Sequence, residues 1–104
     1  MTVAQQQAVE SAKNYLSMGS GFSRAGLIKQ LTSSYGDSFP EDVAIFAVDH
    51  LHVNWNEQAV ESAKNYMSTG GGFSRAGLIQ QLTSSYGEGF TYAQAVYAAN
   101  KVGL

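Results

Sequence analysis

The side chains of this sequence best suited to metal or acid–base chemistry are the two histidines of the run Asp49-His50-Leu51-His52. Helical residues converge on one metal ion when they are three or four positions apart, whereas these histidines are two apart and diverge. The acids Glu41 and Asp42 are adjacent and diverge as well, and no histidine is placed to serve a nucleophilic serine. We therefore predict no metal site, no cofactor and no catalytic centre, and hence a protein that is not an enzyme.

Glycines at positions 21 and 26, and again at 72 and 77, have the spacing of the two glycines in a phosphate-binding loop. Such a loop also needs lysine and then serine or threonine directly after the second glycine, to reach the phosphates and the magnesium ion. Leucine and isoleucine follow here, so we assign these glycines to turns and helix packing. Cysteine is absent, which removes disulfides, thiolate chemistry and zinc sites of the finger type.

The bulk composition is that of a folded, mildly acidic protein. The 104 residues are 44% hydrophobic and 13% charged, with a formal net charge of -2. Proteins that coat nucleic acid usually carry the opposite sign, so nucleic acid is a poor first guess for a partner. No apolar stretch is long enough to cross a bilayer and no signal peptide is recognisable, which indicates a cytosolic protein or a domain of a longer exported precursor.

The dominant feature of the sequence is an internal duplication. Residues 7–36 recur at 58–87, and only four of the thirty aligned positions differ. Beyond position 36 the copies diverge, although Phe39, Ala44 and Ala47 keep their residue types in the second copy. A repeat of this length predicts two copies of one structural unit.

Each copy reads as three helices. In the first helix one apolar face begins at Ala8 and continues with the residues four, seven and eight positions later, Ala12, Tyr15 and Leu16. Ser23 and Ser74 are natural N-caps for the second helix, because a serine hydroxyl can accept a free backbone N–H. We expect that helix to end at Gly36 after burying four residues, Leu27, Ile28, Leu31 and Tyr35.

The third helix is predicted to open near Pro40 in the first copy and near Thr91 in the second. Pro suits a first helical turn, and Thr91 with Gln94 fits a capping box. The apolar stripe shared by the two copies of this helix comprises Ala44, Ala47, Val48 and Leu51, matched by Ala95, Ala98, Ala99 and Val102. We expect this stripe to form the buried face.

The predicted fold is all-α, a tandem repeat of two helix-turn-helix-like units of three helices packed rigidly through a short joint. The units span residues 1–53 and 58–104, and the joint spans residues 54–57. No run of Gly or Ser separates the copies, so a flexible tether is not expected. Trp55 is the one large aromatic of the joint, and we expect its ring to pack the units together.

A helix-turn-helix outline raises DNA binding as an alternative function, with the third helix of each unit in the recognition position. In the first copy this helix carries Glu41, Asp42 and Asp49 and no cation, so its carboxylates would face phosphates of like charge. The charge pattern therefore argues against DNA readout. A general cell-wall attachment module is a third possibility.

Partner binding through the surface is the hypothesis that remains. Residues 7–53 hold five acids and three bases, against two acids and three bases in residues 58–104, so the first copy is the acidic end. The residues we assign to partner binding lie on the two third helices: Glu41, Asp42, Phe46 and Asp49 in the first copy and Tyr92 and Tyr97 in the second. Exposed aromatics beside carboxylates suit a protein partner, although Phe46 and Tyr97 could instead complete the core between the units.

Four motifs give this sequence a resemblance to the Ltp family of host cell surface-exposed lipoproteins. They are SA-x-x-YL from Ser11, FSR-x-GLI-x-QL from Phe22, YG-D-x-F from Tyr35, and A-x-x-AVDHL-x-V-x-W-x-x-QA from Ala44. The likeness extends over essentially residues 7–104. The second copy departs from the pattern after Gly87, and the chain ends before any counterpart of Trp55.

The resemblance implies a protein on the outer face of a Gram-positive cell membrane, held there by a lipid anchor that this sequence lacks. It also implies that the protein blocks DNA injection by a second phage, with the phage tail tape measure protein as partner. We expect a monomer with no catalytic residues. Neither the resemblance nor the residues identify the segment of the partner that is bound.

Overall fold

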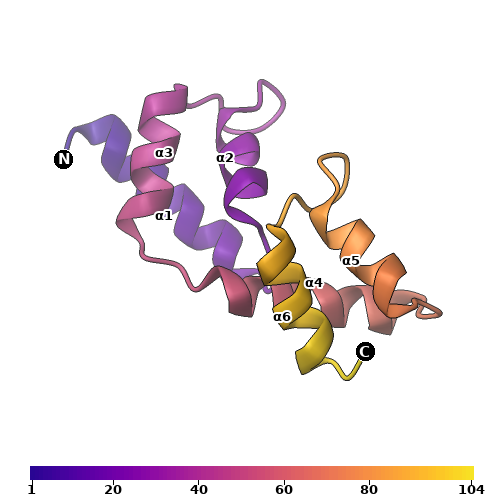
Figure 1. Cartoon of the computed structure of the whole chain (residues 1–104). Coiled ribbons are helices and arrows are strands. Elements are labelled where there is room, and N and C mark those ends of the chain that lie inside the picture. The colour runs from indigo at the N-terminus through magenta and orange to yellow at the C-terminus, as the bar shows by residue number, and fades with distance from the viewer.

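The computed structural model describes all residues 1–104 as six helices without strands. The first unit comprises α1 (Val3–Ser17), α2 (Arg24–Thr32) and α3 (Glu41–His50), and the second comprises α4 (Trp55–Thr69), α5 (Arg75–Thr83) and α6 (Tyr92–Lys101). Figure 1 shows the two units side by side along a molecule that measures 44 × 24 × 21 Å. The all-α tandem repeat predicted from the duplication is confirmed.

The helices begin where the capping signals place them. Ser23 accepts the backbone N–H of Gly26, and the capping box of Thr91 and Gln94 is formed in full. Pro40 directly precedes the first residue of α3. A helix requires no N–H from the residue at this position, so proline is tolerated there. Local hydrogen-bonding groups therefore determine most of the helix starts.

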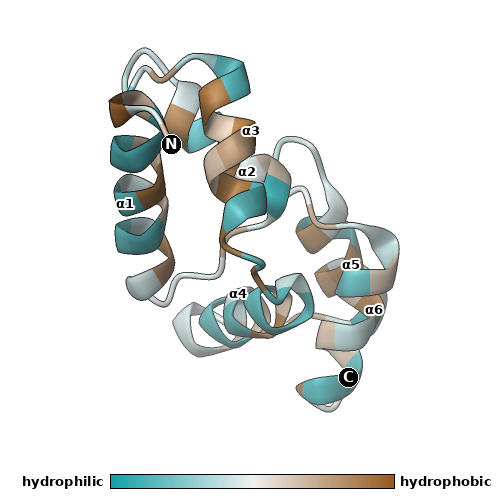
Figure 2. Cartoon of the chain, turned by 90° about the vertical axis from the view of Figure 1, so that its left-hand side faces the viewer, coloured by the Kyte–Doolittle hydropathy of each residue, from teal (hydrophilic) through white to brown (hydrophobic).

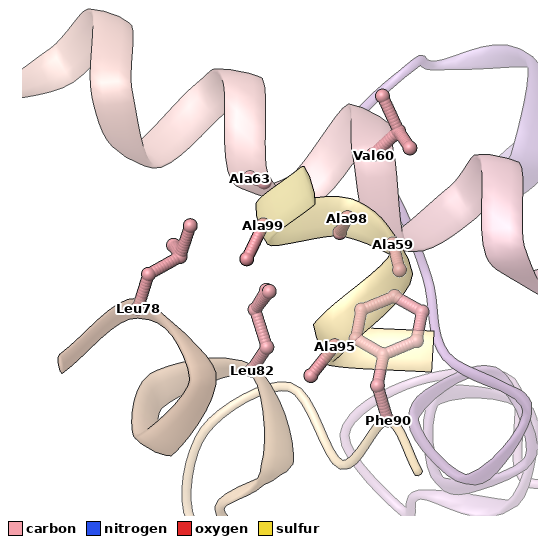
Figure 3. Packing of buried hydrophobic residues seen from close by; sticks show 9 residues of the cluster. All are labelled: Ala59, Val60, Ala63, Leu78, Leu82, Phe90, Ala95, Ala98 and Ala99. Atoms are coloured by element: carbon pink, nitrogen blue, oxygen red, sulfur yellow. The ribbon is translucent and has the colours of Figure 1, made fainter. Parts of the chain in front are cut away.

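Each unit packs α3 or α6 across the other two helices through an alanine face. The stripe positions Ala44, Ala47 and Val48 are buried, and so are their second-copy counterparts Ala95, Ala98 and Ala99. Small side chains let the helices approach closely, and Leu78, Leu82 and Phe90 fill the space that remains in the second unit (Figure 3). Figure 2 shows the hydrophilic face of α1 turned outward, as amphipathic packing requires.

The predicted burial of Tyr35 is wrong. The helix α2 ends at Thr32 rather than at Gly36, because the next residue, Ser33, adopts an extended backbone with ψ 136°. Of the four residues expected in the core, Leu27 and Leu31 are buried and Ile28 is half-buried. Tyr35 lies beyond the helix in a turn and is fully exposed, and so is its counterpart Tyr86.

The joint of residues 54–57 is largely the start of a helix. The side chain of Asn54 caps α4 by accepting the N–H of Glu57, and Trp55 is the first residue of that helix. The half-buried indole packs against the core cluster of the first unit, which contains Leu27, Leu31 and Val48. The first turn of α4 is thereby attached to the unit that precedes it.

The two units meet through a loop that lies across α4. Residues 19–23 form this contact, which we call the docking loop. Within it the Phe22 N–H donates to Gln58 Oε1 at 3.1 Å, and Asn65 Nδ2 donates to the carbonyls of Gly19 and Ser20 at 3.2 and 3.0 Å. A Cβ at Gly21 would lie 2.4 Å from the backbone nitrogen of Ser62, so the loop touches the helix backbone itself.

Candidate functional site

Glu41 and Asp42 are exposed in the first turn of α3. Acids in a first turn face the positive end of the helix dipole, which is a favourable place for them. No hydrogen bond or ion pair within the chain engages either side chain. These two predicted binding residues are therefore free to meet a partner.

Asp49 is already occupied within the chain. Both of its carboxylate oxygens accept hydrogen bonds from Arg24, at 2.8 and 2.9 Å, and this pairing lowers the pKa of Asp49. The matching position in the second unit is Asn100, which accepts from Arg75 at 2.8 Å. The role of this position is thus to attach the end of the third helix to the start of the second, and its charge is partly neutralised.

Phe46 and Tyr97 are half-buried and have partners within the chain. The Phe46 ring stacks on His50, with centroids 5.5 Å apart. The Tyr97 hydroxyl donates to Glu57 at 3.1 Å, and the Lys101 ammonium lies 5.6 Å from the centre of its ring. Neither aromatic side chain is presented freely to solvent.

Tyr92 is the aromatic of the third helices that does face solvent, with 70% of its surface exposed. It lines an open hollow of 410 Å³ between α5 and the start of α6, together with Arg75, Ile79 and Thr83. A hollow with an aromatic edge and apolar walls can accept a side chain of a protein partner.

The most exposed aromatic residues are ones that the helix pattern missed. Tyr35 and Tyr86 each retain 101% of their reference exposure, at the tips of the loops after α2 and α5. The signal was present in the sequence, because the two serines before each tyrosine and the glycine after it are turn-forming residues. We call the segments 33–38 and 84–89 the first and second tip loops.

Backbone hydrogen bonds give the two tip loops one defined shape. The Ser33 carbonyl accepts the N–H groups of Gly36 and Ser38, and the Ser33 hydroxyl accepts the N–H of Tyr35. The equivalent bonds recur in the second loop with the same lengths to within 0.1 Å. Each tyrosine is therefore held outward by an ordered turn, which reduces the entropy lost when a partner binds.

The carboxylates of the tip loops are turned inward. Asp37 accepts a hydrogen bond from the Ser11 hydroxyl, and Glu88 accepts one from the Tyr66 hydroxyl at 2.8 Å. Burial raises the pKa of Tyr66, and the bond to Glu88 raises it further. The outermost residues of both loops are consequently serine, tyrosine and glycine, an uncharged set that antibody paratopes also favour for binding proteins.

Both tip loops project from the same side of the molecule, as Figure 1 shows. The first tip loop leads directly into the start of α3, which carries Glu41 and Asp42, and the second leads into Tyr92. We call this side the loop edge and define it by Tyr35, Glu41, Asp42, Tyr86 and Tyr92. An open hollow of 330 Å³ between α2 and the second tip loop lies along it.

The structure contains neither a cluster of metal-binding side chains nor a helix that could span a membrane. No three side chains of His, Cys, Asp or Glu come together as a metal site would require. The histidines of the run 49–52 end α3, where His50 stacks on Phe46. All six helices are too short or too polar to cross a bilayer.

These features define an all-α tandem repeat of three-helix units, and the comparisons with known proteins give its family. The profile of the host cell surface-exposed lipoproteins matches twice, at residues 4–51 and 54–102. The chain therefore belongs to this lipoprotein family, and the two matches coincide with the two units. Curated protein sequences give no match.

The solved structure most relevant here is that of Ltp, a superinfection exclusion protein from the Streptococcus thermophilus temperate phage TP-J34. It is similar to this chain with 32% sequence identity, a TM-score of 0.84 and 96% of each chain covered. The resemblance seen in the four motifs is thus confirmed at the level of the whole fold. It also agrees with a location at the surface of a Gram-positive cell.

Proposed function

We propose that this chain is the non-enzymatic, protein-binding module of a surface lipoprotein that excludes superinfecting phage. It binds a component of the incoming phage tail, the tape measure protein, and thereby blocks DNA injection. The full-length protein is held on the outer face of a Gram-positive membrane by a lipid anchor. Membership of the lipoprotein family and the similarity to Ltp support this proposal.

The observation that carries the proposal is the pair of fully exposed tyrosines on two tip loops with the same hydrogen-bonded turn. An exposed aromatic ring contributes almost nothing to the stability of the chain that carries it, but it supplies large contact area to a partner. The acids Glu41 and Asp42 beside the first tip suit a partner segment that carries Lys or Arg.

The proposed binding surface is the loop edge, which revises the expectation from the sequence. Glu41, Asp42 and Tyr92 remain in it, and Tyr35 and Tyr86 join them. Asp49, Phe46 and Tyr97 are left out because Arg24, His50 and Glu57 already engage their side chains. The edge therefore combines three exposed tyrosines with one acidic patch.

The test measures binding of purified tape measure fragments and, in parallel, plaque formation on cells that display equal amounts of each variant. Replacing Tyr35 and Tyr86 together by serine should weaken binding at least about tenfold and restore infection. The control is Met18→Ser, which removes a side chain of 70% exposure elsewhere on the surface. Undiminished binding by the double variant would exclude the tip loops as the site.

A second pair of variants tests the acidic patch. Glu41→Gln with Asp42→Asn should slow association and flatten the dependence of binding on salt, because charge complementarity acts mainly on the association rate. The control is Glu61→Gln, which removes an exposed acid from α4. Equal salt dependence in both variants would show that the partner does not contact the start of α3.

A further inference from the structure

The contact between the two units is made by residues that occur twice in the chain, so each of its two sides has a second, unused copy. On one side is the docking loop, Gly19-Ser20-Gly21-Phe22-Ser23. On the other is the docking face of α4, formed by Gln58, Ser62 and Asn65. These three residues follow one another at intervals of four and three positions, which places them on one side of the helix.

The unused loop lies at the far end of the second unit, as Gly70-Gly71-Gly72-Phe73-Ser74, and differs from the docking loop only at Gly71. In the docked copy Ser23 is 1% exposed and Gly21 is buried, whereas Ser74 and Gly72 are exposed. No atom lies within 4 Å of a Cβ built at Gly72. The same residues are therefore covered in one unit and open in the other.

The unused face lies on α1 and carries the same three residue types, Gln7, Ser11 and Asn14, at the same spacing. Gln7 and Asn14 are exposed and make no hydrogen bond through their side chains. The carbonyl of Glu88, which accepts the hydrogen bond of the Ser23 hydroxyl in the docked contact, has its counterpart in Asp37. The docking face thus recurs on the first unit with one difference. There the Ser11 hydroxyl donates to the Asp37 carboxylate, whereas the Ser62 hydroxyl makes no hydrogen bond, so docking on α1 displaces or retains an Asp37 side chain that has no equivalent at Ser62.

The base of the unused loop is already in the docked arrangement. The rings of Phe73 and Tyr66 meet edge to face at 5.6 Å and 73°, as those of Phe22 and Tyr15 do at 5.7 Å and 68°. Only the glycine segment differs, because Gly70 has φ -163° where Gly19 has φ +74°. Three consecutive glycines can make this change at little steric cost.

We propose that the free loop 70–74 of one chain docks on the free α1 face of a second copy, head to tail, by repeating the contact between the units. Charge favours this pairing, since the second unit has a net charge of +1 from two acids and three bases and the first has -2 from five acids and three bases. A head-to-tail contact leaves one side of the contact unused at each end, so further copies can add until the rotation between successive copies closes a ring.

The contact between copies lacks two elements of the contact within the chain. No peptide linker connects the two sides, and Ala4 stands where Trp55 anchors α4. A linker supplies an effective concentration in the millimolar range, so without it the free chains associate weakly. The chain is accordingly a monomer in dilute solution and associates where its surface density is high, as on a membrane.

Cross-linking between different molecules tests this arrangement, because the chain contains no cysteine of its own. One variant carries Gly71→Cys and the other Met18→Cys, and they are mixed at about 1 mM with a short bismaleimide, a concentration set by the expected weakness of the contact. A positive control is a single chain that carries both Ser20→Cys and Thr69→Cys. These two positions correspond to 71 and 18 in the repeat and line one hollow within the chain, so the same reagent should link them. We expect a mixed dimer whose yield rises with protein concentration.

A blocking variant makes the test specific. At Gly21 a Cβ would collide with the α4 backbone, so Gly72→Ala, added to the chain with Cys at 71, should lower the yield of mixed dimer about tenfold. The control Gly103→Ala introduces a methyl group at a similar backbone angle, φ +90°, in open space. The proposal is wrong if no mixed dimer forms above the level in denatured protein, or if Gly72→Ala and Gly103→Ala give the same yield.

Discussion

Replacing Gly21 by alanine should disrupt the contact between the two units more than any other single methyl group added to the chain. The residue has φ +82°, and its Cβ would lie 2.4 Å from the Ser62 nitrogen and 2.6 Å from the Gln58 carbonyl oxygen. Both neighbours are helix backbone, which cannot rotate away as a side chain could. The docking loop must therefore leave α4 or distort it.

The magnitude follows from a comparison with the same change at Gly72. Alanine in the left-handed region costs about 1 kcal/mol at either position, since Gly72 has φ +75°. At Gly72 that is the whole cost, because no atom lies within 4 Å of the added methyl group. At Gly21 the collision adds about 2 kcal/mol, typical of overpacking. We expect losses of about 1 kcal/mol for Gly72→Ala and about 3 kcal/mol for Gly21→Ala.

Urea unfolding followed by circular dichroism and by the fluorescence of Trp55 provides the measurement. Trp55 packs against the core of the first unit from the start of α4, so its signal reports that contact while the helical signal reports both units. For a domain of this size the expected losses correspond to falls in melting temperature of about 5 °C and about 15 °C. Equal losses for the two variants would refute the reasoning, because the collision with α4 would then cost nothing.

Three further expectations can be checked with standard methods. Trp55→Ala should cost about 2–3 kcal/mol in the same urea titration, less than a fully buried tryptophan because the ring is half-buried, and a loss below about 1 kcal/mol would mean that the indole does not hold α4. Asp49→Asn should lower stability by about 0.5 kcal/mol at pH 7. Because Arg24 lowers the pKa of Asp49, the pair stabilises the fold above the unfolded pKa of the carboxyl, and the difference should vanish as the pH falls through the lowered pKa of the folded state. The chain should show no sequence-specific affinity for duplex DNA at physiological salt in a gel shift, since Glu41 and Asp42 would face phosphates, and retention of a defined operator would contradict this.

The parts of the fold that the sequence predicts are those set by local interactions. The caps at Ser23 and Thr91 need only hydrogen-bonding groups within three residues, and the alanine stripe of α3 and α6 needs only helical periodicity. The duplication constrains the prediction of secondary structure most strongly, because each helix assigned in one copy must also fit the sequence of the other copy. The family followed from motifs whose spacing the same helices impose.

Tyr35 shows where periodicity misled the prediction. It lies four residues after the buried Leu31, so a continuing helix would have placed its ring over the core. The helix stops instead, because the Leu31 carbonyl accepts the N–H of Phe39 as the chain turns back. That bond depends on the placement of α3, which local sequence does not encode, and the tyrosine most exposed in the structure was therefore assigned to the interior.

A second limit of prediction from the sequence is that identical residues in the two copies have different surroundings. Ser23 and Ser74 both cap a helix, but only Ser23 is buried, because its hydroxyl also reaches the carbonyl of Glu88 in the other unit. The sequence assigns Asp49 to partner binding, whereas in the structure it pairs with Arg24, which lies 25 residues away in the sequence. Contacts of this kind join positions far apart in the sequence, and a duplicated sequence cannot tell which copy makes them.

The contact between the units also determines the geometry of the proposed binding edge. Ser23 caps the start of α2 and holds the second tip loop through Glu88, while the first tip loop follows the other end of the same helix. The nine residues of α2 therefore act as a spacer of about 14 Å between the contact that positions Tyr86 and the loop that carries Tyr35. If a partner touches both tyrosines, releasing the docking loop must weaken binding even though no binding residue has changed. Two contact points at a fixed separation gain affinity only while the separation matches the partner, so the proposal predicts that a partner binds less tightly when the two units move apart.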